Sequence, residues 1–433
     1  MEERNAALSR ILDNQQACRD AITKVIAGHN AVRPANTVKM YANRQREFCE
    51  WCAQRRFADG ELVREDKLVL FLSDHVIPRG NKRVKLPNGE PKPLSLEGVE
   101  AYTKAVVALY QFQKTATPET QTNSHPRGLA VKSLLDTLQR TKTKRKLANY
   151  EDRGLGTVLD GYNIEDMKQL SEYWLGKGTG EALRDRVDFL LGHALLARGE
   201  NKRHIQLPDL LTLSLPDEGP QTCTPLVVII NRGKTNQHGR TEYGAVMRCK
   251  ELLVCPMNAV AMYLFWRWQV DLEVFPDMST RQGWYDIHLL KGKDPKHEIS
   301  YTAQLEATKR AFKACGIESS VWTHANRGSA AKLAEAAGAD EAQIRRAGRW
   351  NSEKLEGCYL TTLPRKAMRA LAGFRTKGGS YWLDRGVVMP PDALQHLVYP
   401  GIEDAERQLK TSGQREIAGH AFLKMLKDMN VLA

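Results

Sequence analysis

Apolar residues recur at intervals of three and four positions through the first 150 residues, which is the period of helices with one buried face. The pattern predicts a first helix over residues 1–30, which ends near Gly28 and which we interpret as an N-terminal arm. A second helix is predicted with Thr37 as its cap, and two more are expected over residues 96–113 and 126–139. The first part of the chain is therefore predicted to be helical throughout.

The pattern changes in the second part of the chain. Helices are predicted over residues 164–175 and 180–197. A β-branched run at residues 227–230 is then followed by a glycine-containing turn and a second extended run, which predicts an antiparallel hairpin within residues 224–249. Helical patterns return for the rest of the chain. The predicted fold class is mainly α with a small antiparallel sheet.

The chain is strongly basic, since 64 Lys and Arg residues against 51 Asp and Glu residues give a formal charge of +13 among 433 residues. Such a length suggests two or three domains, and the charge points to nucleic acid as a partner. Residues 78–93 form a basic loop, and residues 140–146 ("RTKTKRK") a basic linker that can equally contact phosphates, act as a nuclear import signal or be a solvated hinge. The candidate DNA contacts are Arg44, Arg79, Lys82, Arg83, Lys85, Lys142, Lys144 and Arg145.

Several other classes of protein are disfavoured. Eight cysteines are scattered without a framework, which favours a reducing compartment. The pair Cys49 and Cys52 lacks the second pair that a structural zinc ion would need, so no metal site is expected. The N-terminus lacks the apolar run of a signal peptide, and the most apolar window, residues 260–270, is too short to span a membrane. No membrane partner is expected.

Basic residues of the second part form a candidate site. Arg198 ends an apolar helix, where capping by a cation is the alternative explanation. Lys234 lies at the tip of the predicted hairpin, where a lysine can simply aid solubility. His324 and Arg327 are three residues apart in "HANR", so they share one face of a helix.

Trp350 and Tyr359 complete this candidate site. Trp350 closes a helix in "GRW", and Tyr359 lies one helix later, where a half-buried core position is the commoner fate of a tyrosine. The set acquires a meaning if the bound group is a scissile phosphodiester. Two arginines can hold its non-bridging oxygens as negative charge builds in the transition state, and a tyrosine is a competent nucleophile.

In that interpretation each polar residue has one role. Tyr359 attacks the phosphorus, His324 accepts or relays its proton, and Lys234 protonates the departing 5′ oxygen. Trp350 donates its indole N–H to a phosphate oxygen. This chemistry needs no metal ion and no other cofactor.

The ordered series Arg198, Lys234, "HANR", Trp350 and Tyr359 resembles the Arg, Lys, His-x-x-Arg, His-or-Trp and Tyr set of the tyrosine recombinases, the lambda-integrase type enzymes. The resemblance is closest to the recombinases of Crypton transposons, through phrases such as "IRRAGRWNSEKLEGCYL". It extends to the related yeast centromere-binding proteins, through segments resembling "CPMNAVAMYLFWRW". It covers roughly residues 33–402.

The comparison with these families also exposes departures. The recombinases often carry an acidic residue shortly after the first arginine, and here Glu200 or no residue fills that place. Arg232 competes with Lys234 for the hairpin position. The centromere-binding relatives have lost the catalytic set, whereas this chain retains every member, which favours an active enzyme.

The resemblance implies a C-shaped clamp on double-stranded DNA, made by a helical core-binding domain and a tyrosine recombinase catalytic domain. The implied activity is that of a site-specific recombinase of a mobile element, located in the nucleus, which excises and integrates DNA through a 3′-phosphotyrosine without metal or ATP. The alternative is a catalytically silent, sequence-specific DNA-binding scaffold of the centromere-binding type. The expected parts are an N-terminal arm (1–30), a core-binding domain (31–146), a catalytic domain (147–375) and a C-terminal helical extension (376–433).

Recombination joins two DNA sites, so the resemblance also implies self-association into a dimer or tetramer on DNA. Either the C-terminal helix, residues 416–432, or the N-terminal helix could dock on a neighbouring copy. The alternative is that both helices fold back on their own chain.

Overall fold

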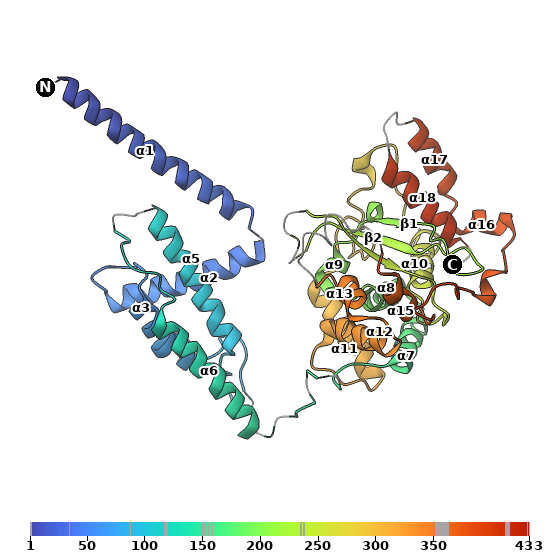
Figure 1. Ribbon diagram of the computed structural model, residues 1–433, viewed down its shortest axis with the longest axis horizontal. Coiled ribbons are helices and arrows are strands. Elements are labelled where there is room, and N and C mark those ends of the chain that lie inside the picture. The colour runs from blue at the N-terminus through green and yellow to red at the C-terminus, as the bar shows by residue number, and fades with distance from the viewer. Residues whose placement is uncertain are drawn as a thin grey trace. The chain divides into compact units, whose positions relative to one another are not determined.

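The computed structural model describes residues 2–33, 35–86, 88–116, 120–148, 150, 152–154, 156–157, 159–233, 236, 239–350, 363–411, 416–430 and 432. The chain forms two compact units, Met1–Asp152 and Arg153–Ala433 (Figure 1). Each unit has its own buried apolar core, as expected for a chain of this length.

The first unit is helical, as the apolar pattern predicts, and its described residues form more helices than the four predicted. These helices are α1 (Glu2–Ala31), α2 (Ala35–Arg55), α3 (Glu65–Leu70), α4 (Ile77–Arg79), α5 (Leu96–Ala116) and α6 (Leu129–Ala148), with a π-helical segment (Phe71–Val76) between α3 and α4. The helix α2 packs along α5, and its buried face carries Phe48 and Trp51. Both rings lie against Phe71, with centroid distances of 5.2 Å.

Two details of the prediction for this unit are wrong. The helix α2 begins at Ala35, so Thr37 lies inside it and does not cap it. Residues 140–146 are the last turns of α6 and not a linker. Lys and Arg are good helix formers, so this basic segment continues the helix. The hydroxyls of Thr141 and Thr143 find acceptors in the carbonyls of residues four positions earlier.

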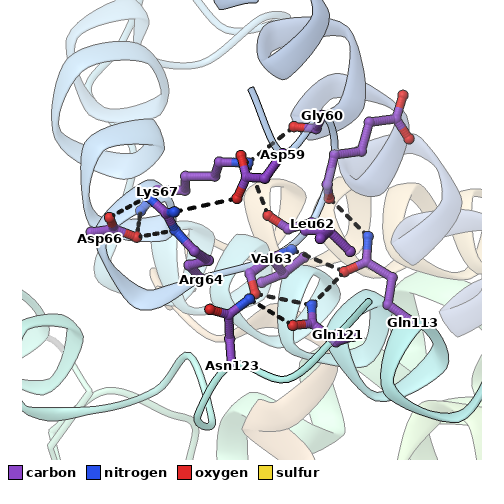
Figure 2. Close-up of polar contacts among 11 residues, drawn as sticks. Asp59, Gly60, Leu62, Val63, Arg64, Asp66, Lys67, Gln113, Gln121 and Asn123 are labelled. Carbon is purple, nitrogen blue, oxygen red and sulfur yellow. Dashed lines mark hydrogen bonds and ion pairs between the residues drawn. The ribbon is translucent and has the colours of Figure 1, made fainter. Parts of the chain in front are cut away.

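A buried lysine fixes the turn between α2 and α3. Lys67 is 1% exposed, and its Nζ donates to the carbonyls of Gly60 and Leu62 at 3.0 and 3.1 Å and pairs with the Asp59 carboxylate (Figure 2). Its ammonium also lies 4.7 Å from the centre of the Phe57 ring. Every polar contact of this buried cation is therefore made by the turn that precedes it.

Two glutamines attach the same turn to α5. The side-chain oxygen of Gln113 accepts from the backbone N–H of Val63 at 2.9 Å, and Gln121 donates to the carbonyl of Val63 at 3.1 Å (Figure 2). Gln121 also donates to Gln113 at 2.9 Å, which closes the set of contacts. The buried backbone of Val63 thus obtains partners although it belongs to no helix or strand.

Replacing Lys67 with Ala is expected to lower the free energy of unfolding of the first unit by about 1–3 kcal/mol, because it removes the donor to the carbonyls of Gly60 and Leu62 and leaves Asp59 with Arg64 alone. Urea unfolding of the full chain, followed by hydrogen exchange in peptides from α2, α3 and α5, measures this effect. The exposed Lys39 on α2 provides the control, since Lys39→Ala is expected to change stability by less than about 0.5 kcal/mol. Equal stability of the two variants would contradict a structural role for Lys67.

The second unit is mainly helical and contains a small sheet. Its helices are α7 (Ile164–Leu175), α8 (Gly180–Ala194), α9 (Gly199–Arg203), α10 (Pro256–Phe265), α11 (Tyr301–Ala314), α12 (Ala325–Ala336), α13 (Glu341–Ala347), α15 (Arg365–Leu371), α16 (Asp392–Val398), α17 (Ile402–Thr411) and α18 (Ile417–Met429). Most residues of α8 and α10 are buried, and these two helices pack against each other at the centre. Mainly α with a small antiparallel sheet, the predicted fold class, is confirmed.

The sheet has three antiparallel strands in the order β1 (Leu210–Thr212), β2 (Leu226–Ile230) and β3 (Glu242–Val246). The predicted hairpin corresponds to β2 and β3, in which Val228 pairs with Gly244. The strand β1 is an addition, and it pairs Leu210 with Val228 on the other edge of β2. Three residues give too short an alternation to predict a strand from sequence.

The C-terminal helix folds back on its own chain, which was one of the two alternatives considered for it. The helix α18 packs against β1 and α17 (Figure 1). Its residues Phe422 and Leu426 are fully buried. Its ends are anchored as well, since Arg281 donates to Glu416 at 2.9 Å and Asn258 donates to the carbonyl of Leu432 at 2.8 Å. The helix α18 therefore belongs to the core of the second unit.

Candidate active site

Arg327 of the "HANR" motif lies buried at the start of α12, with 9% of its surface exposed. Its two terminal nitrogens donate to the carbonyls of Leu196 at 2.8 Å and Gly348 at 3.0 Å. Its guanidinium carbon lies 5.0 Å from the centre of the Trp350 ring. A guanidinium carries five N–H donors, so two carbonyls orient this group without saturating it.

Arg349 binds the backbone next to the carbonyl that Arg327 binds, and it was not among the predicted site residues. It donates to the carbonyl of Leu195 at 3.0 Å, and its Nη1 is buried without a hydrogen-bond partner among the described residues. Its backbone has φ of 53°, a left-handed conformation that non-glycine residues seldom adopt. Its position directly after a helix-ending glycine was the only signal in the sequence, and that signal is too weak to single out an arginine.

Arg198 lies two residues after Leu196, whose carbonyl Arg327 binds, and three after Leu195, whose carbonyl Arg349 binds. The helix predicted over residues 180–197 ends at Ala194, because Leu196 takes a left-handed φ of 46°. Arg198 is consequently the N-cap residue of α9 and does not close α8. A cation is not favoured by the dipole at a helix N-terminus, so the capping explanation for Arg198 is wrong.

Burial and neighbouring guanidinium charges lower the pKa of two of these arginines. Burial is the main cause that lowers the pKa of Arg327 to about 10, and the charges of Arg198 and Arg349 lower it further. Burial likewise lowers the pKa of Arg349 to about 10. The charge of Glu242 raises this pKa, and the charge of Arg198 lowers it. Both groups stay charged near neutral pH. The site is therefore a concentration of positive charge for which an anion would be a favourable ligand.

The other predicted site residues are placed as follows. His324 is exposed and immediately precedes α12, so it lies one turn from Arg327. Trp350 is 40% exposed and covers the Arg327 guanidinium. Lys234 and Tyr359 lie outside the described residues. Arg232, the competitor of Lys234, donates to the carbonyl of His204 at 3.0 Å, and its own carbonyl accepts from Asn201 of α9.

A buried polar network supports the arginines from beneath. Lys202 of α9 pairs with the Asp188 carboxylate of α8 at 2.9 Å, and Gln304 of α11 donates to the same oxygen at 2.7 Å. Asn326, the neighbour of Arg327, donates to the carbonyl of Phe189 at 2.9 Å. These bonds link α9, α11 and α12 to α8. The helices that carry or flank the site residues are thereby fixed relative to one another.

Gly192 of α8 is required by this network. A Cβ atom at this position would lie 2.7 Å from the Lys202 ammonium and would also collide with the amide of Asn326. Gly192→Ala is therefore expected to lower the free energy of unfolding by about 1–3 kcal/mol. Gly328→Ala on α12 is the matched control, since nothing lies within 4 Å of its Cβ position, and it is expected to raise stability by about 0.5–1 kcal/mol. Thermal unfolding of the two variants measures both effects, and a neutral Gly192→Ala would contradict the tight network.

Predicted DNA contacts of the first unit gather around a buried carboxylate. Glu47 is bound by Arg79 at 2.8 Å, Lys82 at 3.0 Å and the Tyr102 hydroxyl at 2.7 Å. Burial alone would raise the pKa of Glu47, but these hydrogen bonds and charges lower it overall. Arg44 lies over the Tyr102 ring at 5.1 Å. The surplus of cations over carboxylates leaves this cluster positively charged.

The remaining predicted contacts lie elsewhere in the first unit. Arg83 and Lys85 are exposed on a loop closed by backbone bonds such as that between Lys92 N and Val84 O. Lys144 and Arg145 are exposed on the last turns of α6. In the same helix, Lys142 bonds Glu97 at 2.8 Å and lowers the pKa of that carboxyl to about 2.

The structure also bears on metal, thiol and membrane sites. Among the described residues, no three His, Cys, Asp or Glu side chains are grouped as metal ligands would be. Cys49 and Cys52 are free thiols on α2, and burial raises the pKa of Cys49 to about 12 and that of Cys52 to about 11. None of the helices in the described part of the chain combines the length and the apolar character of a membrane span.

Comparison with known families identifies the chain. Residues 120–431 match the family model described as "Centromere DNA-binding protein complex CBF3 subunit, domain 2", and the protein belongs to this family. The predicted resemblance to centromere-binding proteins is thereby confirmed. A search of curated proteins finds no significant match.

Solved structures similar to this chain include recombinases and a centromere protein. The XerH recombinase bound to its difH substrate is 14% identical, with 75% of this chain and 76% of that chain covered and a TM-score of 0.44. A Flpe–Holliday junction complex is 12% identical, with coverages of 94% and 98% and a TM-score of 0.41. Ndc10, described as a platform for inner kinetochore assembly in budding yeast, is 11% identical, with coverages of 94% and 97% and a TM-score of 0.34.

Proposed function

We propose that this protein is a site-specific DNA recombinase of a mobile element, which cleaves and rejoins DNA strands through a covalent bond between Tyr359 and a 3′ phosphate. The observation that supports this proposal most strongly is the convergence of Arg198, Arg327 and Arg349. Two of these guanidinium groups bind adjacent carbonyls, and the third follows two residues later in the chain. Holding three like charges together costs free energy, which a bound phosphodiester would offset.

The proposed chemistry assigns roles to the residues around this phosphate. Arg327 and Arg198 would bind the non-bridging oxygens and stabilise the charge of the pentavalent transition state. The Tyr359 oxygen would bond to phosphorus while the bond to the 5′ oxygen breaks. His324 would accept the phenol proton, and Lys234 would supply a proton to the 5′ oxygen. Religation to a partner strand reverses these steps, and no metal, ATP or other cofactor takes part.

Arg349 and Trp350 would position the clamp. The bond from Arg349 to the carbonyl of Leu195 fixes the left-handed turn that precedes Arg198. The Trp350 ring lies over Arg327, so it restricts the rotation of that guanidinium, and its indole N–H can donate to a phosphate oxygen. We assign the exposed cations of the first unit, Arg83, Lys85, Lys144 and Arg145, to contacts with the DNA backbone.

A second function, that of a catalytically silent DNA-binding scaffold in the nucleus, is favoured by the family match. The matched family is named for a centromere DNA-binding complex. A scaffold would use the same positive site to hold a phosphate without cleaving it. The complete residue series favours the enzyme, and the similarity to Crypton recombinases adds the excision and integration of a transposon to the proposal.

Suicide substrates distinguish the two functions. These are nicked duplexes in which cleavage releases a short fragment that diffuses away, so that the strand cannot be rejoined. On such a substrate a recombinase remains covalently joined to a 3′ phosphate of the DNA. A denaturing gel separates this covalent complex from free protein. Binding sites selected from random duplexes supply the substrate sequences. Tight binding with no covalent product on any of the selected sites would favour the scaffold.

A further inference from the structure

Two buried cysteines lie in contact at the turn that joins β3 to α10. Cys249 and Cys255 are 4% and 1% exposed, and both are free thiols. The Cys249 thiol donates a hydrogen bond to the Cys255 sulfur, which also accepts the Cys249 backbone N–H at 3.4 Å. The pair lies directly beneath the surface, since Lys250 and Glu251 of the same turn are exposed. A disulfide between the two sulfurs therefore needs only a local movement.

The surroundings of Cys255 favour its thiolate form. Cys255 is the N-cap residue of α10, where the free N–H groups of the first helical turn attract negative charge. Arg385 donates to the carbonyls of Cys249 and Lys250. The Nε atoms of Arg385 and Arg248 are buried without a hydrogen-bond partner among the described residues, and both guanidinium charges interact with Cys255. A helix N-terminus and two cations thus surround one sulfur.

The two thiols of the pair also differ from each other and from another buried thiol. The hydrogen bond from Cys249 is the main cause that lowers the pKa of Cys255, while burial opposes it. The same hydrogen bond raises the pKa of Cys249. Cys223 is as buried as Cys255, at 1% exposed, and burial raises its pKa to about 12. A thiol that only packs in a core behaves like Cys223 and is inert.

Metal binding does not account for this pair. A structural zinc ion takes four ligands, and in the part of the chain that the structure describes no third His, Cys, Asp or Glu completes a metal-binding group with the two thiols. Oxidation needs only the two sulfurs. A thiolate beside a neutral thiol is the arrangement in which one sulfur attacks an oxidant and the other resolves the product.

We propose that hydrogen peroxide converts Cys249 and Cys255 into a disulfide, with Cys255 as the attacking thiol. The Cys255 thiolate bonds to one peroxide oxygen, the O–O bond breaks, and the departing hydroxide takes up a proton to become water. The Cys249 sulfur then loses its proton and bonds to the Cys255 sulfur, while the S–O bond of the sulfenic acid breaks and a second water leaves. Two thiols and one peroxide thus give one disulfide and two waters. This proposal is independent of whether the protein cleaves DNA.

Peptide mapping of the folded, full-length chain after graded exposure to hydrogen peroxide tests the disulfide. Remaining thiols are blocked with N-ethylmaleimide in denaturant, and the chain is digested without reduction. Trypsin cuts after Lys250, so the disulfide is expected to join the peptides Cys249–Lys250 and Glu251–Arg267. The linked peptides should appear at least about tenfold faster than the Cys223 thiol is lost. Equal rates, or a pair that stays reduced at a dose that oxidises the exposed Cys18, would overturn the proposal.

Two matched serine variants test which sulfur attacks. Cys249→Ser removes the resolving thiol, so Cys255 is expected to accumulate as a sulfenic acid, which dimedone added with the denaturant converts to a stable adduct. Cys255→Ser is expected to leave Cys249 as an unmodified thiol. Circular dichroism of both variants checks that they fold like the wild type. An adduct on Cys249 in Cys255→Ser, or an unmodified Cys255 thiol in Cys249→Ser, would overturn the assignment of Cys255 as the attacking thiol.

Discussion

Replacing Arg327 with Ala is expected to slow formation of the covalent protein–DNA complex by about a thousandfold. Removing one donor that stabilises developing charge costs about two to three orders of magnitude in rate, and this donor is already oriented by Leu196, Gly348 and Trp350. Single-turnover cleavage of a suicide substrate, at protein concentrations that saturate binding, measures this rate separately from affinity.

The same substitution has a structural cost that must be separated from the catalytic one. Loss of the guanidinium leaves two buried carbonyls without donors, which is expected to lower the free energy of unfolding by about 1–3 kcal/mol for each. Arg327→Lys keeps the charge but not the paired donors, so we expect it to recover part of the rate. Arg345→Ala, on the exposed face of α13, is the control and should retain the full rate. An Arg327→Ala protein that is folded and cleaves at the wild-type rate would contradict the proposed clamp.

Replacing Tyr359 with Phe is expected to abolish the covalent complex while leaving DNA affinity within about twofold of wild type. Phenylalanine retains the ring but lacks the oxygen that bonds to phosphorus, so no step after binding can occur. Binding is measured by fluorescence anisotropy with a fixed duplex at one stated salt concentration, because affinity for DNA depends strongly on salt. Covalent complex is measured on denaturing gels with the same duplex carrying a nick.

Another tyrosine of the second unit provides the matched control for that experiment. Tyr243 lies on β3, is 41% exposed, and was not assigned to the site. Tyr243→Phe should form covalent complex at the wild-type rate. If Tyr359→Phe forms as much complex as wild type, another residue is the nucleophile and the assignment of Tyr359 is wrong.

The elements that the sequence predicted best are those whose pattern is local and long. The helices of the first unit follow from the spacing of residues such as Phe48 and Trp51, which are buried as expected. The hairpin of β2 and β3 follows from a β-branched run and a turn. In each case one segment carries enough positions to define its own period.

The parts that the sequence did not predict depend on contacts between distant segments. The end of α8 is set by the left-handed turn at Leu196, whose carbonyl and that of Leu195 bind arginines more than 130 residues away. The burial of Lys67 depends on the carbonyls of a turn that has no regular pattern. A leucine or a lysine gives no local indication of such a position, because the cause lies in its partners.

Several residues of the candidate site were named from the sequence, and the structure adds Arg349. Arg327 and Trp350 lie together, with Arg198 close to both carbonyl-bound arginines. Arg349 was missed because its role depends on a left-handed backbone and on the position of Leu195. The assignments of Lys234 and Tyr359 rest on the sequence alone and remain predictions.

The most direct test of strand transfer is to identify the bond formed on a suicide substrate. Wild-type protein trapped with a nicked duplex is digested with protease and nuclease, and the modified peptide is sequenced by mass spectrometry. The proposal predicts a nucleotide attached through its 3′ phosphate to Tyr359, with a free 5′ hydroxyl on the departing strand. Tight binding without any modified peptide, or a nucleotide attached to a different residue, would contradict the proposed mechanism.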